Sequence, residues 1–205
     1  ETTFRHEADA AYKAQRKGMP EELAMQMLPL KQVLTAMSIP RYELTGYEAD
    51  DLIGTISRKC EAAGWDCVIV TGDKDSLQLI TDHTKVKLVS TRMGQTTTKD
   101  MTPETFQETY GFAPIHMIDL KALMGDSSDN IPGVPGIGEK TAMALVQEYG
   151  SIDTLYAQMP DVHAKPAALR KLQEGEESAR HSYWLATIVT DAPLEFRPED
   201  NLRQP

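Results

Sequence analysis

The hydrophobic positions in the first part of the chain predict two helices. Apolar residues recur at helical spacing between residues 20 and 39, after a proline and two glutamates of the kind that suit a first helical turn. Pro29 should bend or split this helix. A second helix should begin near Thr45, whose spacing from Glu48 matches a capping box, and should end at Gly64.

The pattern then changes to alternating strands and helices. Residues 67–71 form a continuous apolar run rich in β-branched residues, which predicts a strand buried on both faces. A short helix is expected over 75–80 and a second strand over 86–90. This alternation indicates an α/β sheet with parallel strands.

Only helices are predicted after Pro103. The expected ranges are 103–110, 114–124, 138–149, 151–159, 165–174 and 178–190. Glycine and proline crowd into 125–138, the most loop-like stretch of the chain. We therefore expect an α/β body over residues 1–124, with a mostly parallel sheet and flanking helices, and a helical region over 125–205.

The composition fits a globular protein but raises an objection to one class of ligand. Of the 205 residues, 40% are hydrophobic and 25% are charged. No apolar run is long enough to cross a bilayer, and a secretion signal is not recognisable, so we expect a soluble, cytoplasmic monomer. Cys60 and Cys67 are too few for a disulfide framework or a structural zinc site. The formal net charge of −10, taken alone, argues against nucleic acid.

Three groups of carboxylates stand out by their positions. They are Glu48, Asp50 and Asp51 at a helix start, Asp73 and Asp75 directly after the buried strand, and Asp126 and Asp129 in the glycine-rich loop. Ligands of open α/β sheets bind beyond the carboxyl ends of the strands, where Asp73 and Asp75 fall. Each group alone has an ordinary explanation as helix caps or solvated loop residues, and the loops lack the glycine and glutamate of an EF-hand. The combination is more specific than any one group.

Seven carboxylates brought together would repel one another unless a positive charge held them. Mg²⁺ or Mn²⁺ suits all-oxygen ligands, and two such ions can activate a water and stabilise the leaving oxygen in phosphodiester cleavage. Glu48 and Asp51 share a helix face, whereas Asp50 lies to one side, so not all three need be direct ligands. Without these seven charges the total is −10 + 7 = −3, so the acidic balance does not exclude DNA.

The glycine-rich segment 131–142 predicts a nucleic-acid contact. It nearly matches a P-loop, but Glu139 interrupts the motif and no strand precedes it. A helix-hairpin-helix fits better, with a short first helix around 130–133 and a turn at 136–138, because glycines let a backbone approach a phosphate. A plain interhelical turn would need fewer glycines and prolines. The expected DNA contacts are Gly133, Gly136, Gly138, Lys140 and Thr141.

Several motifs in one order carry a family resemblance. They are Phe4-Arg5-His6-Glu7, Gly46-Tyr47-Glu48-Ala49-Asp50-Asp51, Thr71-Gly72-Asp73-Lys74-Asp75, Gly125-Asp126-Ser127-Ser128-Asp129-Asn130, and the run from Pro132 to Ala142. With them the chain resembles, over nearly its whole length, the 5′-nuclease domain of bacterial DNA polymerase I and the flap endonucleases. The resemblance implies a PIN-like fold and hydrolysis of DNA flaps or 5′ ends in primer removal and repair.

The resemblance also assigns roles to individual residues. Arg5 and Lys13 would contact the scissile phosphate, Arg16 would bind DNA, and residues 12–22 would form an arch over the 5′ end. Asp51 and Asp73 would act in catalysis as well as in metal binding. One metal cluster would consist of Glu48, Asp50, Asp51, Asp73 and Asp75, and the second metal position would be completed by Asp126 and Asp129. A K⁺ ion at the hairpin is a further expectation.

The sequence departs from the family pattern at its start. Family members begin with a strand bearing a metal-binding aspartate and have a second strand ending in another, before the region of Phe4, and neither is found in this sequence. The expectation is therefore a fragment or a truncated product with impaired catalysis, with a fused polymerase region downstream. Two alternatives stay open: a module that binds branched DNA without cutting it, and a PIN-type ribonuclease, against which the hairpin argues.

Overall fold

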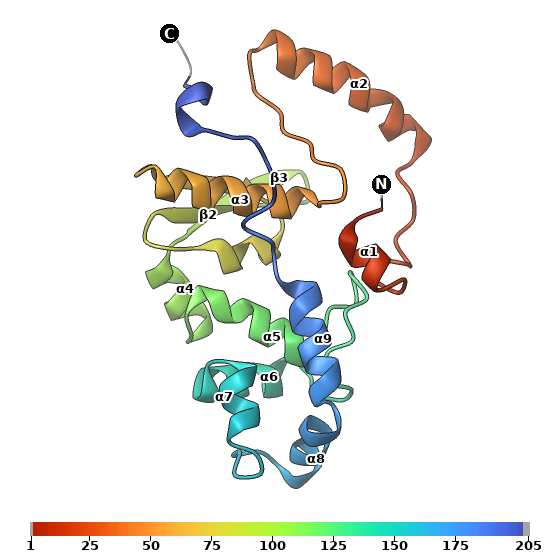
Figure 1. Ribbon diagram of the computed structural model, residues 1–205, viewed down its shortest axis with the longest axis vertical. Coiled ribbons are helices and arrows are strands. Elements are labelled where there is room, and N and C mark those ends of the chain that lie inside the picture. Colours follow the sequence, from red (N-terminus) through yellow and green to blue (C-terminus); the bar gives the residue numbers. More distant parts are fainter. Residues whose placement is uncertain (1, 203–205) are drawn as a thin grey trace.

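The computed structural model describes residues 2–202 and has an α/β body above a helical half (Figure 1). The body contains α1 (Phe4–Ala8), α2 (Glu21–Ala36), α3 (Ala49–Ala62), β1 (Cys67–Thr71), the 3₁₀ helix η1 (Lys74–Leu79), β2 (Thr84–Arg92), β3 (Gln95–Met101) and α4 (Pro103–Tyr110). The helical half contains η2 (Pro114–His116), α5 (Met117–Met124), α6 (Glu139–Tyr149), α7 (Ile152–Ala157), α8 (Pro166–Glu174) and α9 (Glu176–Ala186), and η3 (Pro198–Asn201) follows.

The sheet has the order β1-β2-β3 and is mixed. β1 runs parallel to β2, with Ile69 opposite Val86, as expected. β3 runs antiparallel to β2 and was not predicted, because its polar residues 95–100 are exposed and carry no apolar alternation. The turn before it uses two residues with positive φ, Met93 and Gly94, which is the backbone of a tight hairpin.

The prediction that β1 is buried on both faces is wrong. Ile69 is buried, but Val68 and Val70 are 48% and 63% exposed. β1 is an edge strand of the sheet, and among residues 2–202 the side on which these two valines lie is only partly covered.

The expected start of α3 at Thr45 is also corrected. The helix begins at Ala49 with Glu48 at its N-cap, because the Asp51 carboxylate accepts a hydrogen bond from the Glu48 N–H at 3.0 Å. An acidic pair therefore replaces the Thr45 cap, and this local contact fixes two of the candidate site residues relative to each other.

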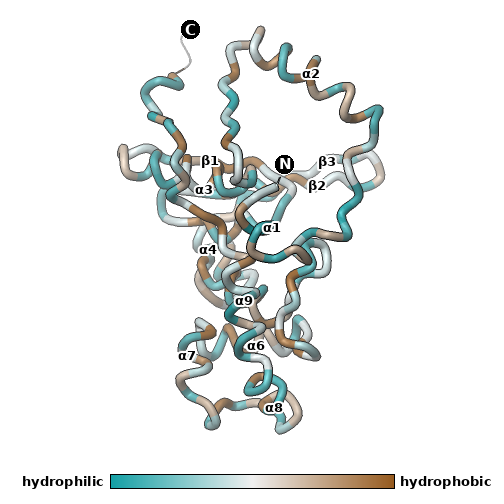
Figure 2. Tube along the Cα trace, turned by 45° about the vertical axis from the view of Figure 1, so that its right-hand side comes forward, coloured by the Kyte–Doolittle hydropathy of each residue, from teal (hydrophilic) through white to brown (hydrophobic). Residues whose placement is uncertain are grey.

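α2 stands away from the rest of the body (Figures 1 and 2). It is continuous across Pro29, so the proline does not split it, and none of its residues is buried. The segment that stands away from the body therefore includes the whole of α2 and extends beyond residues 12–22, where an arch was expected. That this segment arches over a 5′ end stays a prediction.

The helical half follows the predicted ranges with two corrections. α9 ends at Ala186 and not at residue 190. The short hairpin helix expected at 130–133 is absent from the described residues: this stretch is a loop closed by a bridge between Asp126 and Ile131, and α5 is the helix that leads into it. Large apolar side chains of α4 to α8 share one core with those of the sheet, so the two halves pack together.

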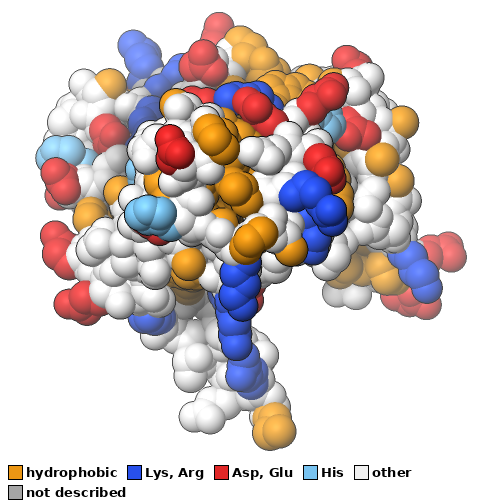
Figure 3. Space-filling model, turned by 90° about the horizontal axis from the view of Figure 1, so that it is seen from below, with side chains coloured by type: hydrophobic (Ala, Val, Ile, Leu, Met, Phe, Trp, Pro, Cys, Tyr) orange, Lys and Arg blue, Asp and Glu red, His pale blue; other side chains and the backbone are white. Residues whose placement is uncertain are grey.

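The surface is mixed in charge. Seen from below, Lys and Arg side chains form a row along a projecting segment with a hydrophobic side chain at its tip (Figure 3). None of the helices within residues 2–202 combines the length and the apolar character that a membrane span requires.

Candidate metal and nucleic-acid site

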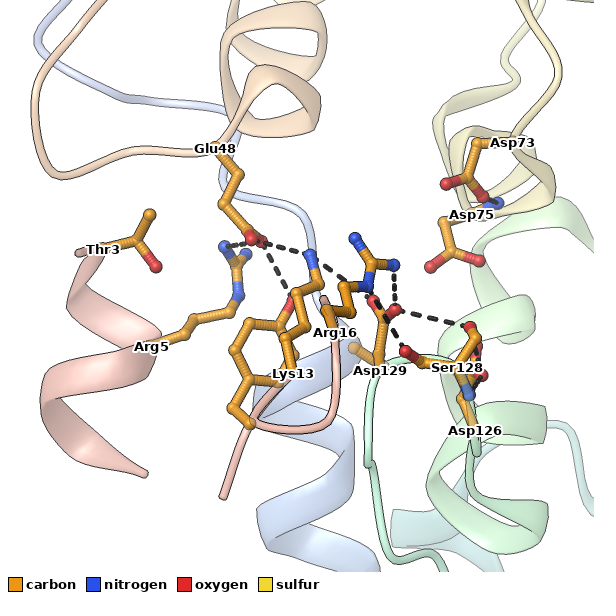
Figure 4. A network of polar contacts seen from close by, with 12 residues as sticks. Thr3, Arg5, Lys13, Arg16, Glu48, Asp73, Asp75, Asp126, Ser128 and Asp129 are labelled. Atoms are coloured by element: carbon orange, nitrogen blue, oxygen red, sulfur yellow. Dashed lines mark hydrogen bonds and ion pairs between the residues drawn. The ribbon is translucent and has the colours of Figure 1, made fainter. Parts of the chain in front are cut away.

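Acidic and basic side chains from four separate segments meet beside the N-terminus of α3 (Figure 4). Glu48 lies on one side with Arg5 and Lys13, and Asp73, Asp75 and Asp126 lie on the other, with Asp129 and Arg16 between them. The structure therefore brings together residues that lie far apart in the sequence, as the motif pattern predicted. It also brings basic groups into the same site.

Arg5 and Asp51 form a buried pair at the base of the site. Both Arg5 amino groups donate to the Asp51 carboxylate at 2.8 Å, and the Val189 N–H donates to it at 2.9 Å. Burial opposes ionisation of Asp51, but Arg5 together with the Val189 and Glu48 N–H groups outweighs it and lowers the pKa of the carboxyl. Since Asp51 is fully buried and both its oxygens are already used, it holds Arg5 and the start of α3 in place and does not face the cleft.

Lys13 and Tyr12 hold the Glu48 side chain. The Lys13 ammonium lies 2.6 Å from one Glu48 oxygen, and the Tyr12 hydroxyl donates to the other at 2.9 Å. Burial and the neighbouring Glu48 carboxylate raise the pKa of Tyr12, so the phenol remains a proton donor. Lys13 has a positive φ of 53°, a conformation that is uncommon outside glycine and aims its side chain into the site.

Asp50 lies to one side of Glu48 and Asp51, as the helical spacing indicated. Glu48 and Asp51 both pair with Arg5, and Asp50 lines, together with Glu48, the same small cavity as Asp75 and Asp129. Burial, followed by repulsion from Asp73 and Asp75, raises the pKa of Asp50 to about 6. The site therefore holds more negative charge around Asp50 than its basic side chains neutralise.

Asp73, Asp75 and Asp126 meet at the carboxyl end of β1. Asp73 is the exposed N-cap of η1 and accepts a hydrogen bond from the Asp75 N–H at 2.9 Å. Lys121 of α5 bridges the other two: its ammonium contacts Asp75 and lies 2.6 Å from Asp126. Burial opposes ionisation of Asp126, but Lys121 and the hydrogen bonds from Ser128 together outweigh it and lower the pKa of that carboxyl to about 2.

Lys121 is the functional residue that sequence reasoning missed. It is buried in a helix whose other residues are mostly apolar, and burial favours loss of its proton, but Asp75 and Asp126 raise its pKa instead. Its position five residues before Asp126, in a helix that leads into the acidic loop, was the available signal.

Asp129 connects the acidic loop to the first segment of the chain. Arg16 pairs with one Asp129 oxygen, and Lys13 lies 3.5 Å from the other. The Lys13 N–H also donates to the Asp129 carbonyl at 2.9 Å. The Arg16 side chain is half exposed, whereas those of Lys13 and Asp129 are mostly buried.

The carboxylates are not arranged as a closed metal centre. Within residues 2–202, no three His, Cys, Asp or Glu side chains are close enough to hold one ion. The cavity among Lys13, Glu48, Asp50, Asp75 and Asp129 has a volume of about 20 Å³, room for about one water-sized particle. Carboxylate oxygens nevertheless match the donors that Mg²⁺ and Mn²⁺ prefer, so the chemistry of the site fits such ions better than its present spacing does.

The hairpin places its predicted contacts in two environments. Gly136, Gly138 and Lys140 are exposed at the start of α6, and Thr141 is half-buried. Gly133 is buried: its N–H donates to Ser182 at 2.9 Å and its carbonyl accepts from Ser178 at 2.6 Å, which gives this glycine a packing role.

Two family models match the chain end to end. Residues 1–111 match the model described as 5′-3′ exonuclease, N-terminal resolvase-like domain, and residues 112–205 match the model described as 5′-3′ exonuclease, C-terminal SAM fold. Among curated relatives, the DNA polymerase I of Bacillus subtilis (strain 168) is 47% identical over 95% of this chain, and that of Bacillus caldotenax is 43% identical over 97%. The chain spans 22% of the length of both relatives.

Solved structures share the fold. One described as divalent metal ions (zinc) bound to T5 5′-exonuclease has a TM-score of 0.74 and 27% identity, over 93% of this chain and 72% of that one. A bacteriophage T5 flap endonuclease in a pseudo-enzyme-product complex with DNA and metal ions has a TM-score of 0.73 and 26% identity, over 93% and 71%. The α/β body followed by a helical region is therefore the architecture expected from the sequence, and the chain belongs to the 5′-3′ exonuclease family.

Proposed function

We propose that this chain hydrolyses phosphodiester bonds of DNA at 5′ ends or flaps, with two divalent cations held by its carboxylates. The observation that carries the proposal is the meeting of Asp50, Asp73, Asp75 and Asp126 from three segments at the carboxyl end of β1. Burial and mutual repulsion raise the pKa of both Asp50 and Asp75. A cation between these groups would relieve that repulsion.

The proposed ligands are these four aspartates, with Glu48 and Asp129 completing the second position. Asp51 is left out as a direct ligand because Arg5 and two backbone N–H groups occupy its oxygens. When bound, the ions would activate a water and stabilise the departing 3′ oxygen. The related T5 structures, one with bound divalent metal ions and one with DNA and metal ions, support this assignment.

The basic side chains hold and orient groups at this site. Lys13 and Arg16 supply positive charge beside Asp129, where a DNA phosphate would need it. Lys121 is a positioning residue, since it holds Asp75 and Asp126 together across two segments. Arg5 is fixed by Asp51 and donates to the Thr187 carbonyl at 2.6 Å, so it ties α1 to the end of α9.

The hairpin is proposed to hold the sugar-phosphate backbone at a distance from the cut. Gly136 and Gly138 expose backbone at the N-terminus of α6, and Lys140 and Thr141 follow directly. The K⁺ ion expected there stays a prediction. The Lys171 ammonium already donates to the Gly136 carbonyl at 3.2 Å, so a positive charge contacts this turn.

The experiment is cleavage of a 5′-labelled flap duplex in Mg²⁺. We expect a short labelled product, its loss when EDTA replaces Mg²⁺, and its loss in Asp73→Asn. The exposed Asp161→Asn is the matched control and should cut normally. A product that forms equally in Asp73→Asn would remove the proposed centre from the reaction.

A second candidate function is a module that binds branched DNA without cutting it. It is favoured because, among residues 2–202, no three His, Cys, Asp or Glu side chains are close enough to hold a metal ion. It predicts flap binding that weakens steeply with salt and no turnover in Mg²⁺ or Mn²⁺. Comparison of matched DNA and RNA flaps distinguishes both from a ribonuclease. Five further expectations stay predictions: a fused polymerase region, a monomeric state, a cytoplasmic location, a role in primer removal and repair, and a domain boundary between residues 124 and 125.

A further inference from the structure

Four aromatic rings gather beside the candidate site, where α1, the segment before α3, and α9 meet. The Phe4 ring centroid lies 5.6 Å from that of Tyr47 and 5.9 Å from that of Trp184. The His181 ring lies 6.2 Å from the Trp184 ring and is nearly parallel to it, at 19°. We call Phe4, Tyr47, His181 and Trp184 the aromatic platform.

The aromatic platform directly adjoins the carboxylate cavity. Three of its residues are each followed in the sequence by a residue that lines this cavity. Phe4 is followed by Arg5, Tyr47 by Glu48, and Trp184 by Leu185. Neighbouring Cα atoms are about 3.8 Å apart. Adjacent backbone positions of the same segments therefore carry the platform and part of the cavity lining.

The outer part of the aromatic platform is exposed and ordered. Trp184 is 41% exposed and belongs to neither hydrophobic core cluster, although its neighbour Leu185 is buried in one. The His181 Nε2 atom lies 2.7 Å from an oxygen of Asp9, the residue that follows α1, and this contact holds the ring in place. The fold thus holds two stacked rings at its surface that it does not need for its core.

We infer that the aromatic platform is a stacking subsite for a nucleobase of the strand whose phosphate lies at the carboxylates. The inference rests on the proposed function, because the ligand is DNA. Every base has a flat π-face, so stacking on an aromatic ring tolerates any sequence. This matches a hairpin that would contact the sugar-phosphate chain and not the base edges.

The first test uses Trp184 as its own reporter. The chain has two tryptophans, so Trp65→Phe leaves Trp184 as the single one. A dye-labelled 5′-flap duplex is titrated in EDTA and in Ca²⁺, with binding followed by anisotropy and stacking by Trp184 emission. We expect quenching on binding, and recovery of the emission when one base near the cut position is replaced by an abasic site.

The outcomes separate this inference from the proposed function. Binding by anisotropy with unchanged Trp184 emission overturns the aromatic subsite and leaves the nuclease proposal intact. Quenching that no abasic position reverses also overturns it. No binding of the flap duplex at all overturns the proposed function, and this inference falls with it.

The second test compares affinities in matched variants. Trp184→Ala should bind the flap duplex about 5- to 150-fold more weakly, and Trp184→Phe should stay within about threefold of the native chain. Trp65→Ala is the control, because Trp65 is 38% exposed and lies before β1, at the opposite end of the strand from Asp73. Equal losses in the two alanine variants, or no loss in Trp184→Ala with a native circular dichroism spectrum, would contradict the subsite.

Discussion

Replacing Asp50 with asparagine should make the protein more stable in the absence of metal. The pKa of Asp50 rises from its usual 3.8 to about 6 because of burial and the charges of Asp73 and Asp75. A rise of about 2 units corresponds to about 3 kcal/mol against the ionised form, and partial solvent exposure reduces this to about 1 to 2 kcal/mol. Asparagine keeps the shape of the side chain and removes the charge.

The sign of the pH dependence follows from linkage. Folded Asp50 keeps its proton to a higher pH than the unfolded chain does, so the folded state binds more protons between about pH 4 and pH 6. The free energy of unfolding therefore falls as the pH rises through this window. Asp50→Asn should match the native chain near pH 4 and exceed it by about 1 to 2 kcal/mol at pH 8.

Urea unfolding in EDTA, followed by circular dichroism at pH 4 and pH 8, measures this difference. Asp161→Asn controls for the loss of an exposed charge and should show no such gain. Added Mg²⁺ should stabilise the native chain more than Asp50→Asn, because a ligand of the folded state has been removed. If Asp50→Asn is less stable than the native chain at pH 8, or if the difference does not change with pH, the argument for unneutralised charge at this site is wrong.

Three further changes test other parts of the structure. Lys121→Met leaves Asp75 and Asp126 without their shared cation, so urea unfolding in EDTA should show a loss of about 3 to 5 kcal/mol, which Mg²⁺ partly restores; an unchanged stability would contradict the bridge. Arg5→Lys cannot reproduce the two-point contact with Asp51 and should lower the flap cleavage rate and the melting temperature together. Gly133→Ala, whose new Cβ would overlap the backbone before the hairpin, should cost about 3 kcal/mol in the same unfolding assay, whereas Gly138→Ala, with open space around it, should fold normally.

Helices with clear start and stop residues could be predicted from the sequence, and so could the family motifs. α4 begins after Thr102 at a proline and ends at Gly111 in the left-handed conformation, and these are local signals. β3 could not be found in this way because its stability comes from pairing with β2 and not from burial of its own side chains. β1 was found at its correct bounds, but its apolar run indicated burial on both faces, whereas Val68 and Val70 are exposed.

The acidic residues of the site and the basic residues Arg5, Lys13 and Arg16 were predictable, but the ion pairs between the two groups and the part played by Lys121 were not. Sequence position alone identified seven carboxylates, and the expected counter-charge was metal. The structure places Arg5, Lys13, Arg16 and Lys121 among them, because α5 and the segment after α1 pack against the same edge. Helical periodicity separated Asp50 from Glu48 and Asp51 but could not show which of these side chains would pair with Arg5. The structure pairs Glu48 and Asp51 with Arg5 and leaves Asp50 facing the cavity.

The most direct measurement of the central claim is an anomalous difference map from crystals grown with Mn²⁺. The account predicts Mn²⁺ peaks between Asp50, Asp73, Asp75 and Asp126, with the Lys121 ammonium moved away from at least one carboxylate. Mn²⁺ bound only elsewhere, with Lys121 still bridging Asp75 and Asp126, would contradict it.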